Sequence, residues 1–281
     1  MPPADAWSEW GGGGPRLALT HANGFPPESY RTLIERLTGD FSVATVASRP
    51  LWPDREPDEI ASWEPLAGDL VQLLERHAGG AVLGVGHSLG GALMALAAAR
   101  SPDLFSALVL LDPVVFSGAR SMVWGLMKRL GCGRRFPLVR GAERRRDRWP
   151  DRAAVRASWG GRSVFASWDR RAFDDYLEGG LADAADGTVT LRYPKRWEAR
   201  IFAICPHDLW PELVRVSVPA LVVRGERSDT LLPGAARRMA RDMRNAELVE
   251  LDGTSHFLPM ERPDEVAELI VGFAQELDTT T

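Results

Sequence analysis

The residues of this sequence that could carry out chemistry begin with a serine between two glycines, Gly86-x-Ser88-x-Gly90. This spacing is typical of a sharp turn between a strand and a helix, which lifts the serine hydroxyl clear of a sheet. The serine backbone is strained there, so the positions two before and two after it come close together and glycine fits. Ser88 is therefore the candidate nucleophile for acyl transfer; the alternative is a serine that merely occupies a glycine-rich turn.

A serine hydroxyl needs a base, and the sequence offers five histidines. His256 follows the last expected strand, at the carboxyl edge where sites form on parallel sheets, and is the candidate base. His87 adjoins the serine, but its side chain is expected to point away from the turn, into the core or behind the site. His21 leads a loop at the same edge and could line a pocket. His77 and His207 are expected at the surface.

The base in turn needs an orienting carboxylate, which in this kind of sheet lies between the serine and the histidine in chain order. Asp229 follows the strand expected to end near residue 224, and it is the preferred candidate. Asp112, at the end of the strand after the serine helix, is the main alternative. Glu226 lies nearer its strand and is a further alternative, whereas Asp252 more readily stabilises its own turn.

Acyl transfer also needs hydrogen-bond donors for the oxyanion. One expected donor is the backbone N–H of Leu89, directly after the serine. The other is expected from the loop after the first parallel strand, where the Phe25 N–H follows the turn residues Asn23 and Gly24.

Strands must alternate with helices to bring these residues to one edge. Apolar and β-branched patterns predict strands at 16–20, 41–47, 81–85, 107–111, 218–224 and 246–251. Helical patterns occupy 28–37, 57–77, the run up to residue 100, 233–243 and 263–277. Every position of 107–111 is apolar, as in strands buried on both faces. This alternation predicts the α/β class, with a mostly parallel sheet covered by helices on both faces.

The alternation stops between residues 114 and 213. That gap is too long for a loop in a compact domain, so we expect a mostly helical inserted domain, with 1–113 and 214–281 forming the core. The insertion holds six of the ten tryptophans, and Trp124, Phe136, Trp149, Trp159, Phe165 and Trp168 supply apolar bulk. These aromatic residues could contact an apolar substrate or simply pack the insertion onto the core.

The charge of the chain is uneven. The whole sequence carries −4, yet residues 120–171 hold fifteen basic and four acidic residues, a net +11 that leaves −15 elsewhere. The acidic total argues against a nucleic-acid partner. The arginine run could attract anionic substrates or lipid headgroups, although a solvated helix face is the commoner explanation.

Composition excludes several classes of protein. With 45% hydrophobic and 26% charged residues the chain is not disordered, and no apolar run reaches the roughly 18 residues of a membrane helix. Residues 1–14 lack the features of a signal peptide, and Cys132 and Cys205 could form one disulfide at most. These features predict a cytoplasmic protein. No cluster of residues has metal-ligand spacing, and no cofactor is expected.

The stretches 86–91, 224–229 and 255–263 resemble signature motifs of the α/β-hydrolase family and follow one another in the same order as in that family. The resemblance covers nearly the whole chain outside the insertion. The insertion resembles the family's helical cap. Two departures are the Asn23-Gly24 pair, where such enzymes usually have His-Gly, and an N-terminal hairpin reduced to a single possible strand within residues 5–10. Family members that use an aspartate nucleophile are epoxide hydrolases and dehalogenases, so Ser88 implies acyl chemistry instead.

Three functional interpretations follow. The leading one is a serine carboxylic-ester hydrolase that acts through an acyl-enzyme on a small to medium apolar ester. The second is hydrolysis of a thioester or a C–C bond by the same residues, and perhydrolase activity also belongs to this chemistry. The third is a non-catalytic ligand-binding protein on the same fold. The sequence makes no prediction of the oligomeric state.

Overall fold

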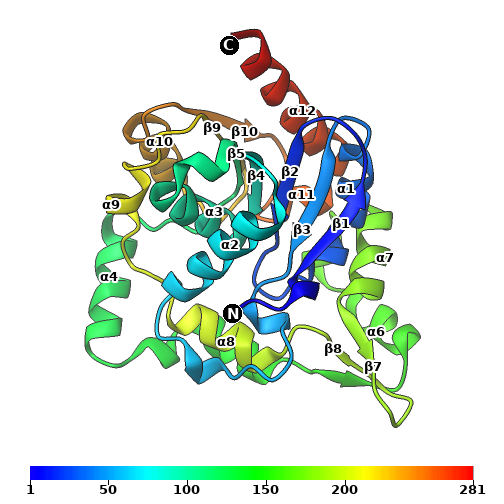
Figure 1. Cartoon of the computed structure of the whole chain (residues 1–281). Helices are drawn as coiled ribbons and strands as arrows, with labels where there is room; N and C mark the ends of the chain where they lie inside the picture. The colour runs from blue at the N-terminus through cyan, green and yellow to red at the C-terminus, as the bar shows by residue number, and fades with distance from the viewer. Residues whose placement is uncertain (281) are drawn as a thin grey trace.

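The computed structural model describes residues 1–280, whose main feature is a sheet of seven strands in the order β1-β3-β2-β4-β5-β9-β10 (Figure 1). The strands are β1 (Trp7–Gly11), β2 (Arg16–Thr20), β3 (Ser42–Val46), β4 (Val82–His87), β5 (Phe105–Leu111), β9 (Ala220–Gly225) and β10 (Ala246–Leu251). All neighbouring strands are parallel except β1, which runs antiparallel to β3. The predicted mostly parallel sheet is confirmed, and its one antiparallel strand occupies an edge.

Helices cover both faces of the sheet. One face packs against α2 (Glu64–His77), α3 (Leu89–Arg100) and α10 (Pro233–Asp242), and the other against α1 (Arg31–Leu37) and α12 (Pro263–Thr280). Strand β5 contributes to both clusters, Leu108 and Leu110 to the first and Val109 and Leu111 to the second. This alternation explains why every position of the strand is apolar.

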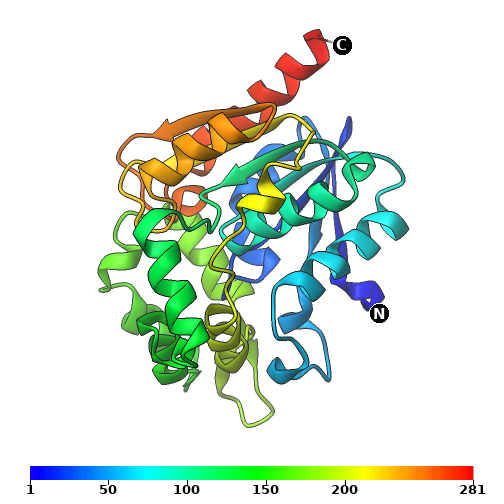
Figure 2. The same cartoon turned by 90° about the vertical axis from the view of Figure 1, so that its left-hand side faces the viewer.

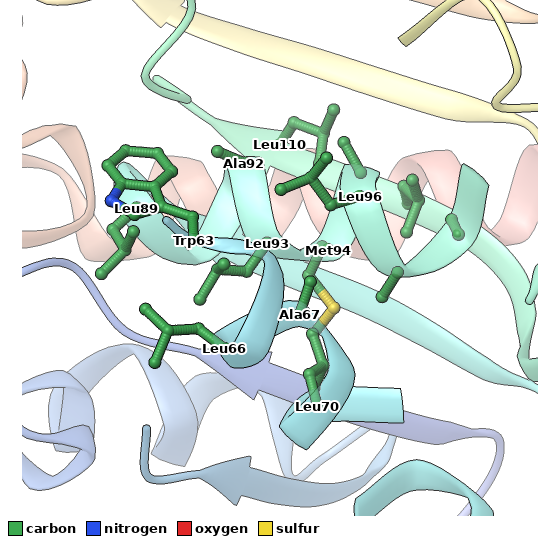
Figure 3. Close-up of a cluster of buried hydrophobic side chains, with 14 of the residues drawn as sticks. Trp63, Leu66, Ala67, Leu70, Leu89, Ala92, Leu93, Met94, Leu96 and Leu110 are labelled. Carbon is green, nitrogen blue, oxygen red and sulfur yellow. The ribbon is translucent and has the colours of Figure 1, made fainter. Parts of the chain in front are cut away.

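The nucleophile helix α3 is buried between the sheet and α2. Figure 3 shows Leu66 and Leu70 of α2 close to Leu93 and Met94 of α3, in the cluster that also holds Leu110 of β5. Every residue of α3 from Leu89 to Ala99 is buried. A helix that is apolar all round has no solvent-facing side. The element that carries the candidate nucleophile is therefore fixed from all directions.

Two predicted helices begin differently in the structure. The predicted helix 57–77 is a 3-10 turn, η4 (Pro57–Glu59), followed by an irregular stretch before α2 begins at Glu64. Pro65 explains the break, because proline is tolerated in the first turn of a helix but not in its interior. The predicted helix 28–37 likewise starts as the 3-10 helix η2 (Pro27–Tyr30) before α1.

The segment between β5 and β9 holds the residues that are predicted to form an inserted domain, and it is called the insertion below. Its helices are α4 (Gly118–Arg129), α5 (Pro137–Arg144), α6 (Arg152–Trp159), α7 (Arg170–Gly179), α8 (Lys195–Ala203) and α9 (Trp210–Leu213). It also contains an antiparallel sheet in the order β6-β8-β7, formed by β6 (Arg148–Trp149), β8 (Val189–Leu191) and β7 (Leu181–Asp183). That sheet was not predicted, because strands of two or three residues are too short to show a period-two pattern.

The insertion gathers at one end of the molecule, whereas the last turns of α12 project from the opposite end (Figures 1 and 2). The remaining short elements are α11 (Leu258–Glu261) and the 3-10 helices η1 (Ala4–Ala6), η3 (Arg49–Leu51), η5 (Pro102–Leu104), η6 (Gly133–Arg135) and η7 (Ser163–Phe165). None of the helices in residues 1–280 has the length and apolarity that crossing a membrane requires.

The insertion packs tightly against the rest of the chain. The Trp63 indole N–H donates to the carbonyl of Ile201, at 3.1 Å, and the Asp175 carboxylate accepts from the backbone N–H of Thr32, at 2.7 Å. Both hydrophobic clusters contain side chains from the insertion and from the sheet. The division into 1–113 with 214–281 and a separate 114–213 therefore stays a prediction.

Candidate active site

Ser88 lies at the sharp turn between β4 and α3. Its φ of 58° and ψ of −116° are a strained conformation for a residue with a side chain. A Cβ on Gly86 would lie 2.5 Å from the Gly90 carbonyl carbon, and one on Gly90 would lie 2.5 Å from the Thr20 carbonyl oxygen. The close approach expected from the glycine spacing is confirmed. It presents the serine hydroxyl beside the N-terminus of α3.

His256 meets this hydroxyl from the loop between β10 and α11. Its Nε2 lies 2.9 Å from the Ser88 Oγ, and its Nδ1 lies 2.7 Å from Oδ2 of Asp112. The Asp112 side chain is fully buried, and that of His256 is 16% exposed. With the carboxylate accepting from Nδ1–H, Nε2 is free to accept the serine proton.

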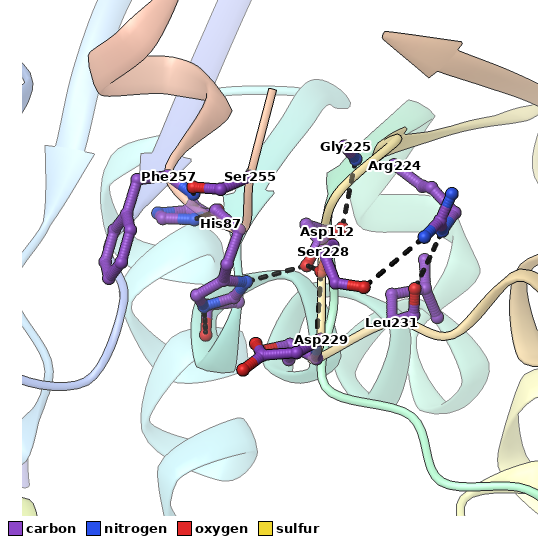
Figure 4. Close-up of polar contacts among 12 residues, drawn as sticks. His87, Asp112, Arg224, Gly225, Ser228, Asp229, Leu231, Ser255 and Phe257 are labelled. Atoms are coloured by element: carbon purple, nitrogen blue, oxygen red, sulfur yellow. Dashed lines mark hydrogen bonds and ion pairs between the residues drawn. The ribbon is translucent and has the colours of Figure 1, made fainter. Parts of the chain in front are cut away.

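Asp112 is held at the end of β5 by the neighbouring loop. The Gly225 N–H donates to its Oδ1, at 3.2 Å, and the Ser228 hydroxyl donates to its Oδ2, at 2.6 Å. Its own φ is 43°, which turns the carboxylate away from the strand direction. Figure 4 shows the Asp112 side chain beside Gly225 and Ser228.

The preference for Asp229 over Asp112 as the partner of the histidine is corrected by this geometry. Asp229 follows Ser228 on the same loop, and its side chain lines the cavity described below, but the carboxylate that contacts His256 belongs to Asp112. The reason is the shape of the loop. The buried Arg224 donates to the carbonyls of Ser228 and Leu231, which turns Ser228 toward the buried carboxylate. Loop geometry of this kind leaves no pattern in the sequence.

His87 points away from the serine, as expected, and lies behind the site. The Ala22 N–H donates to the Tyr30 hydroxyl (3.0 Å), this hydroxyl donates to Nδ1 of His87 (2.7 Å), and Nε2–H of His87 donates to the His256 carbonyl (2.8 Å). Burial, followed by the proximity of His256, lowers the pKa of His87 well below its usual value, so the ring is neutral. Tyr30 was not singled out, because it falls within the predicted helix 28–37 and a helical pattern does not mark it as a polar contact.

His21 is also buried and neutral, but it is not among the residues that line the large cavity. Its Nδ1–H donates to the Ala22 carbonyl, at 2.9 Å, and its Nε2 accepts from the backbone N–H of Ser48, at 3.0 Å. Burial lowers its pKa to about 4. The ring therefore braces the loop that follows β2. Of the last two histidines, His207 is exposed and His77 is half-buried, stacked on Trp7.

The two expected oxyanion donors differ in whether their backbone N–H groups are free to bind a ligand. Leu89 begins α3, so its N–H has no acceptor in the preceding turn. The Phe25 N–H, expected to face the oxyanion, instead donates to the Ala22 carbonyl, at 3.2 Å, and closes a turn. The backbone N–H of Asn23, inside that turn, has no hydrogen-bond partner within residues 1–280. Asn23 also lines the cavity with Ser88. Its side-chain NH₂ donates to the Glu198 carbonyl, which holds the loop against α8.

A cavity of about 900 Å³ opens above Ser88 and His256. Five of the six aromatic residues singled out in the insertion line it: Phe136, Trp149, Trp159, Phe165 and Trp168. Trp124 instead packs on Phe136 and donates to the Cys205 carbonyl. Cys205 also lines the cavity, and burial raises the pKa of its thiol to about 12. Neither cysteine forms a disulfide, and within residues 1–280 no three side chains converge as metal ligands.

Comparison with known proteins extends over most of the chain. The sequence profile of the Alpha/beta hydrolase family matches residues 17–269. The 2-(acetamidomethylene)succinate hydrolase of Mesorhizobium japonicum is 25% identical over 267 residues, covering 93% of this chain and 88% of that protein. Lipase LipV of Mycobacterium tuberculosis is 33% identical over 214 residues, covering 72% and 71%. The crystal structure of E-2-(acetamidomethylene)succinate hydrolase superposes with a TM-score of 0.76 at 24% identity, covering 96% and 94%.

Proposed function

Because this chain belongs to the alpha/beta hydrolase family, we propose that it is a serine carboxylic-ester hydrolase that acts through an acyl-enzyme on small to medium apolar esters. One observation carries this proposal. The Ser88 hydroxyl, the His256 ring and the Asp112 carboxylate form a continuous hydrogen-bonded chain, with contacts of 2.9 and 2.7 Å, at the floor of a large aromatic cavity. Nucleophile, base and orienting acid are thus in reach of one another before any substrate binds.

In the first step His256 accepts the Ser88 proton at Nε2 as the serine Oγ forms a bond to the ester carbonyl carbon. Asp112 accepts the hydrogen bond from Nδ1 and stabilises the imidazolium that forms. Ser228 and Gly225 supply the hydrogen bonds that keep this carboxylate in place. Asp112 therefore acts through the histidine and has no contact with substrate.

The tetrahedral oxyanion is stabilised by the backbone N–H groups of Leu89 and Asn23. Leu89 contributes the N-terminus of α3, where the helix dipole favours negative charge. Asn23 replaces Phe25 as the second donor because the Phe25 N–H is already used within the loop. Collapse of the intermediate passes the proton from His256 to the leaving alcohol.

Water then cleaves the acyl-enzyme with the same groups. His256 removes a proton from water, the hydroxide oxygen bonds to the acyl carbon, and Ser88 leaves with the proton returned by the histidine. The insertion acts as a cap over this reaction. Its aromatic side chains account for much of the cavity wall, and they favour apolar acyl or alcohol groups while reducing access of bulk water.

The decisive experiment measures hydrolysis of p-nitrophenyl esters of increasing acyl length by the wild type and by Ser88→Ala. We expect turnover that disappears in Ser88→Ala, with an optimum of medium length that reflects the cavity. Ser106→Ala, an exposed serine on β5, is the matched control and should retain full activity. A fluorophosphonate probe should label the wild type and not Ser88→Ala.

Other outcomes separate the remaining interpretations. If the probe labels Ser88 but no oxygen ester is hydrolysed, thioesters and substrates with a C–C bond next to a carbonyl become the candidates, since the same three residues perform those reactions. If the probe fails to label Ser88 in folded protein, the chain is a binding protein on a hydrolase fold and the proposal is wrong.

A further inference from the structure

The wall of the cavity carries more positive than negative charge. Five arginines line it, against the two carboxylates of Glu198 and Asp229. Arg145 pairs with Glu198, at 3.0 Å, and donates to the Tyr176 hydroxyl, at 2.6 Å, so this pair is part of the wall's internal support. The four other arginines are Arg120, Arg144, Arg146 and Arg162.

These four guanidinium groups have no carboxylate partner within residues 1–280. Arg120 donates to the backbone carbonyls of Asp229 and Thr230, and Arg146 donates to the carbonyl of Arg148. Arginines of the same segment outside the cavity do form ion pairs: Arg148 with Asp186, Arg152 with Asp183 and Arg156 with Asp174. Positive charges that face a cavity without a counter-ion attract an anion supplied by a ligand.

Three of the four arginines line the cavity together with one aromatic pair, Trp149 and Trp159. The Arg146 guanidinium is 5.3 Å from the ring centroid of Trp149, which meets Trp159 edge-on at 5.6 Å. The Arg162 backbone N–H donates to the Trp159 carbonyl, and Arg144 is the last residue of α5, two positions before Arg146. An indole face beside a guanidinium limits its motion while leaving its N–H groups available.

Aromatic side chains separate these arginines from the reacting groups. The ring of Phe257, the residue after the catalytic histidine, has its centroid 5.7 Å from that of Phe25. The Phe25 ring in turn stacks on Tyr176, with 4.8 Å between the centroids. Tyr176 stacks in turn on Trp159, at 5.1 Å. A ligand that reaches from Ser88 to the arginines therefore passes along an apolar surface and ends among positive charges.

We propose, building on the ester hydrolase function, that the substrate is apolar around its scissile ester but carries a carboxylate at the remote end, and that Arg144, Arg146 and Arg162 bind this carboxylate. A planar guanidinium binds a carboxylate with two parallel hydrogen bonds. The carboxylate takes no part in the reaction: water is added across the ester bond, which yields an acid and an alcohol, and the remote group is unchanged. The apolar middle of the substrate lies along Phe25 and Tyr176.

The test compares two substrates that differ in one charge, p-nitrophenyl hydrogen suberate and its methyl ester, p-nitrophenyl methyl suberate. A second pair, 4-carboxyphenyl butyrate and phenyl butyrate, places the carboxylate on the alcohol side. We expect kcat/KM to favour the anionic member of at least one pair through a lower KM. In the triple variant Arg144→Gln/Arg146→Gln/Arg162→Gln this preference should fall about 10- to 100-fold.

The matched control is Arg148→Gln/Arg152→Gln/Arg156→Gln, which removes the same charge from the same segment outside the cavity. It should keep the preference of the wild type. Equal loss of preference in both triple variants would mean general attraction of anions and would overturn the assignment, as would equal kcat/KM for both members of both pairs.

Binding is measured separately, so that failure of this inference and failure of the ester hydrolase function remain distinguishable. Monomethyl suberate is titrated into Ser88→Ala while tryptophan fluorescence is followed, because Trp149 lies beside Arg146 and meets Trp159 edge-on. Saturable binding that is lost in the cavity triple variant supports the anion site even if no ester is hydrolysed. Turnover of neutral esters without such binding refutes the anion site and leaves the ester hydrolase function standing.

Discussion

The floor and the wall of the cavity are built in different ways. On the floor, Ser88, Asp112 and His256 lie at the ends of three sheet strands, and backbone geometry positions them: two of them have positive φ, and glycines permit the close approaches. The wall comes from the insertion and is held by aromatic stacking and by one largely buried ion pair, Arg145 with Glu198.

This difference assigns the chemical reaction to the floor of the cavity and the selection of substrate to its wall. A strained turn between buried elements has one arrangement, so a change on the floor should lower kcat. A wall of stacked rings and exposed arginines touches the substrate far from the reacting atoms, so a change there should act mainly on KM. The predictions below test this division.

The largest effect is expected at the floor, from Asp112→Asn. An asparagine whose oxygen accepts from the Gly225 N–H places its NH₂ where Oδ2 of Asp112 lies, against Nδ1 of His256, which favours the wrong tautomer of the ring, and kcat should fall about 10³–10⁴-fold. Asp229→Asn, at the cavity wall, should change kcat less than about threefold, because it does not orient the base. Steady-state kinetics on a p-nitrophenyl ester measures both. The reverse ranking would show that the histidine turns to Asp229 during the reaction.

The next largest effect is a loss of stability, which we expect from Gly86→Ala. The new Cβ would lie 2.5 Å from backbone atoms of Gly90, and Gly90 in the first turn of α3 already lies against the backbone of Thr20, so we expect a loss of about 3 kcal/mol in the free energy of unfolding. Gly68→Ala is the control, since nothing lies within 4 Å of that position in α2 and alanine favours a helix. Urea denaturation should show opposite signs for the two variants. A Gly86→Ala protein as stable as the wild type would contradict the tight turn.

The sequence was sufficient to predict most of the core, because its signals are local. The strand pattern at 16–20 and 246–251 matches β2 and β10 to the residue, and the glycine spacing identified the turn at Ser88. The elements and the serine–histidine contact depend on hydrophobic periodicity and on strand ends meeting at one edge. Hydrophobic periodicity can be read directly from the sequence, and the meeting of strand ends follows from the parallel arrangement that the periodicity predicts.

The errors have a common physical origin in loops. Asp112 and Asp229 both follow strands that end at the same edge, and only the fold of residues 225–231 decides which carboxylate contacts His256. Phe25 failed as a donor for a similar reason, because the turn that closes on Ala22 uses its N–H. The small sheet of the insertion was missed because its strands are too short for a pattern.

A smaller effect is expected from pH at His21, behind the floor. Burial lowers its folded-state pKa to about 4, below the 6.5 of an exposed histidine, so the unfolded chain binds the extra proton first. The stabilisation from neutral His21 is complete above pH 6.5 and declines as the pH falls toward 4, with about 2 kcal/mol lost by pH 5. Urea denaturation from pH 8 to pH 5 should show a smaller decline for His21→Gln than for the wild type. Parallel curves would mean that folding does not lower the pKa of His21.

The smallest effects come from two tyrosines, one in each region. Tyr30→Phe leaves the Ala22 N–H and Nδ1 of His87 without a partner, which loosens the loops that carry the oxyanion donor and His256. We expect kcat to fall about tenfold with little change in KM. Tyr176→Phe keeps the stacked ring but loses the bond from Arg145, so KM should rise about threefold at nearly constant kcat. If both variants changed the same parameter, floor and wall would be one mechanical unit, and the separation of reaction from selection would be wrong.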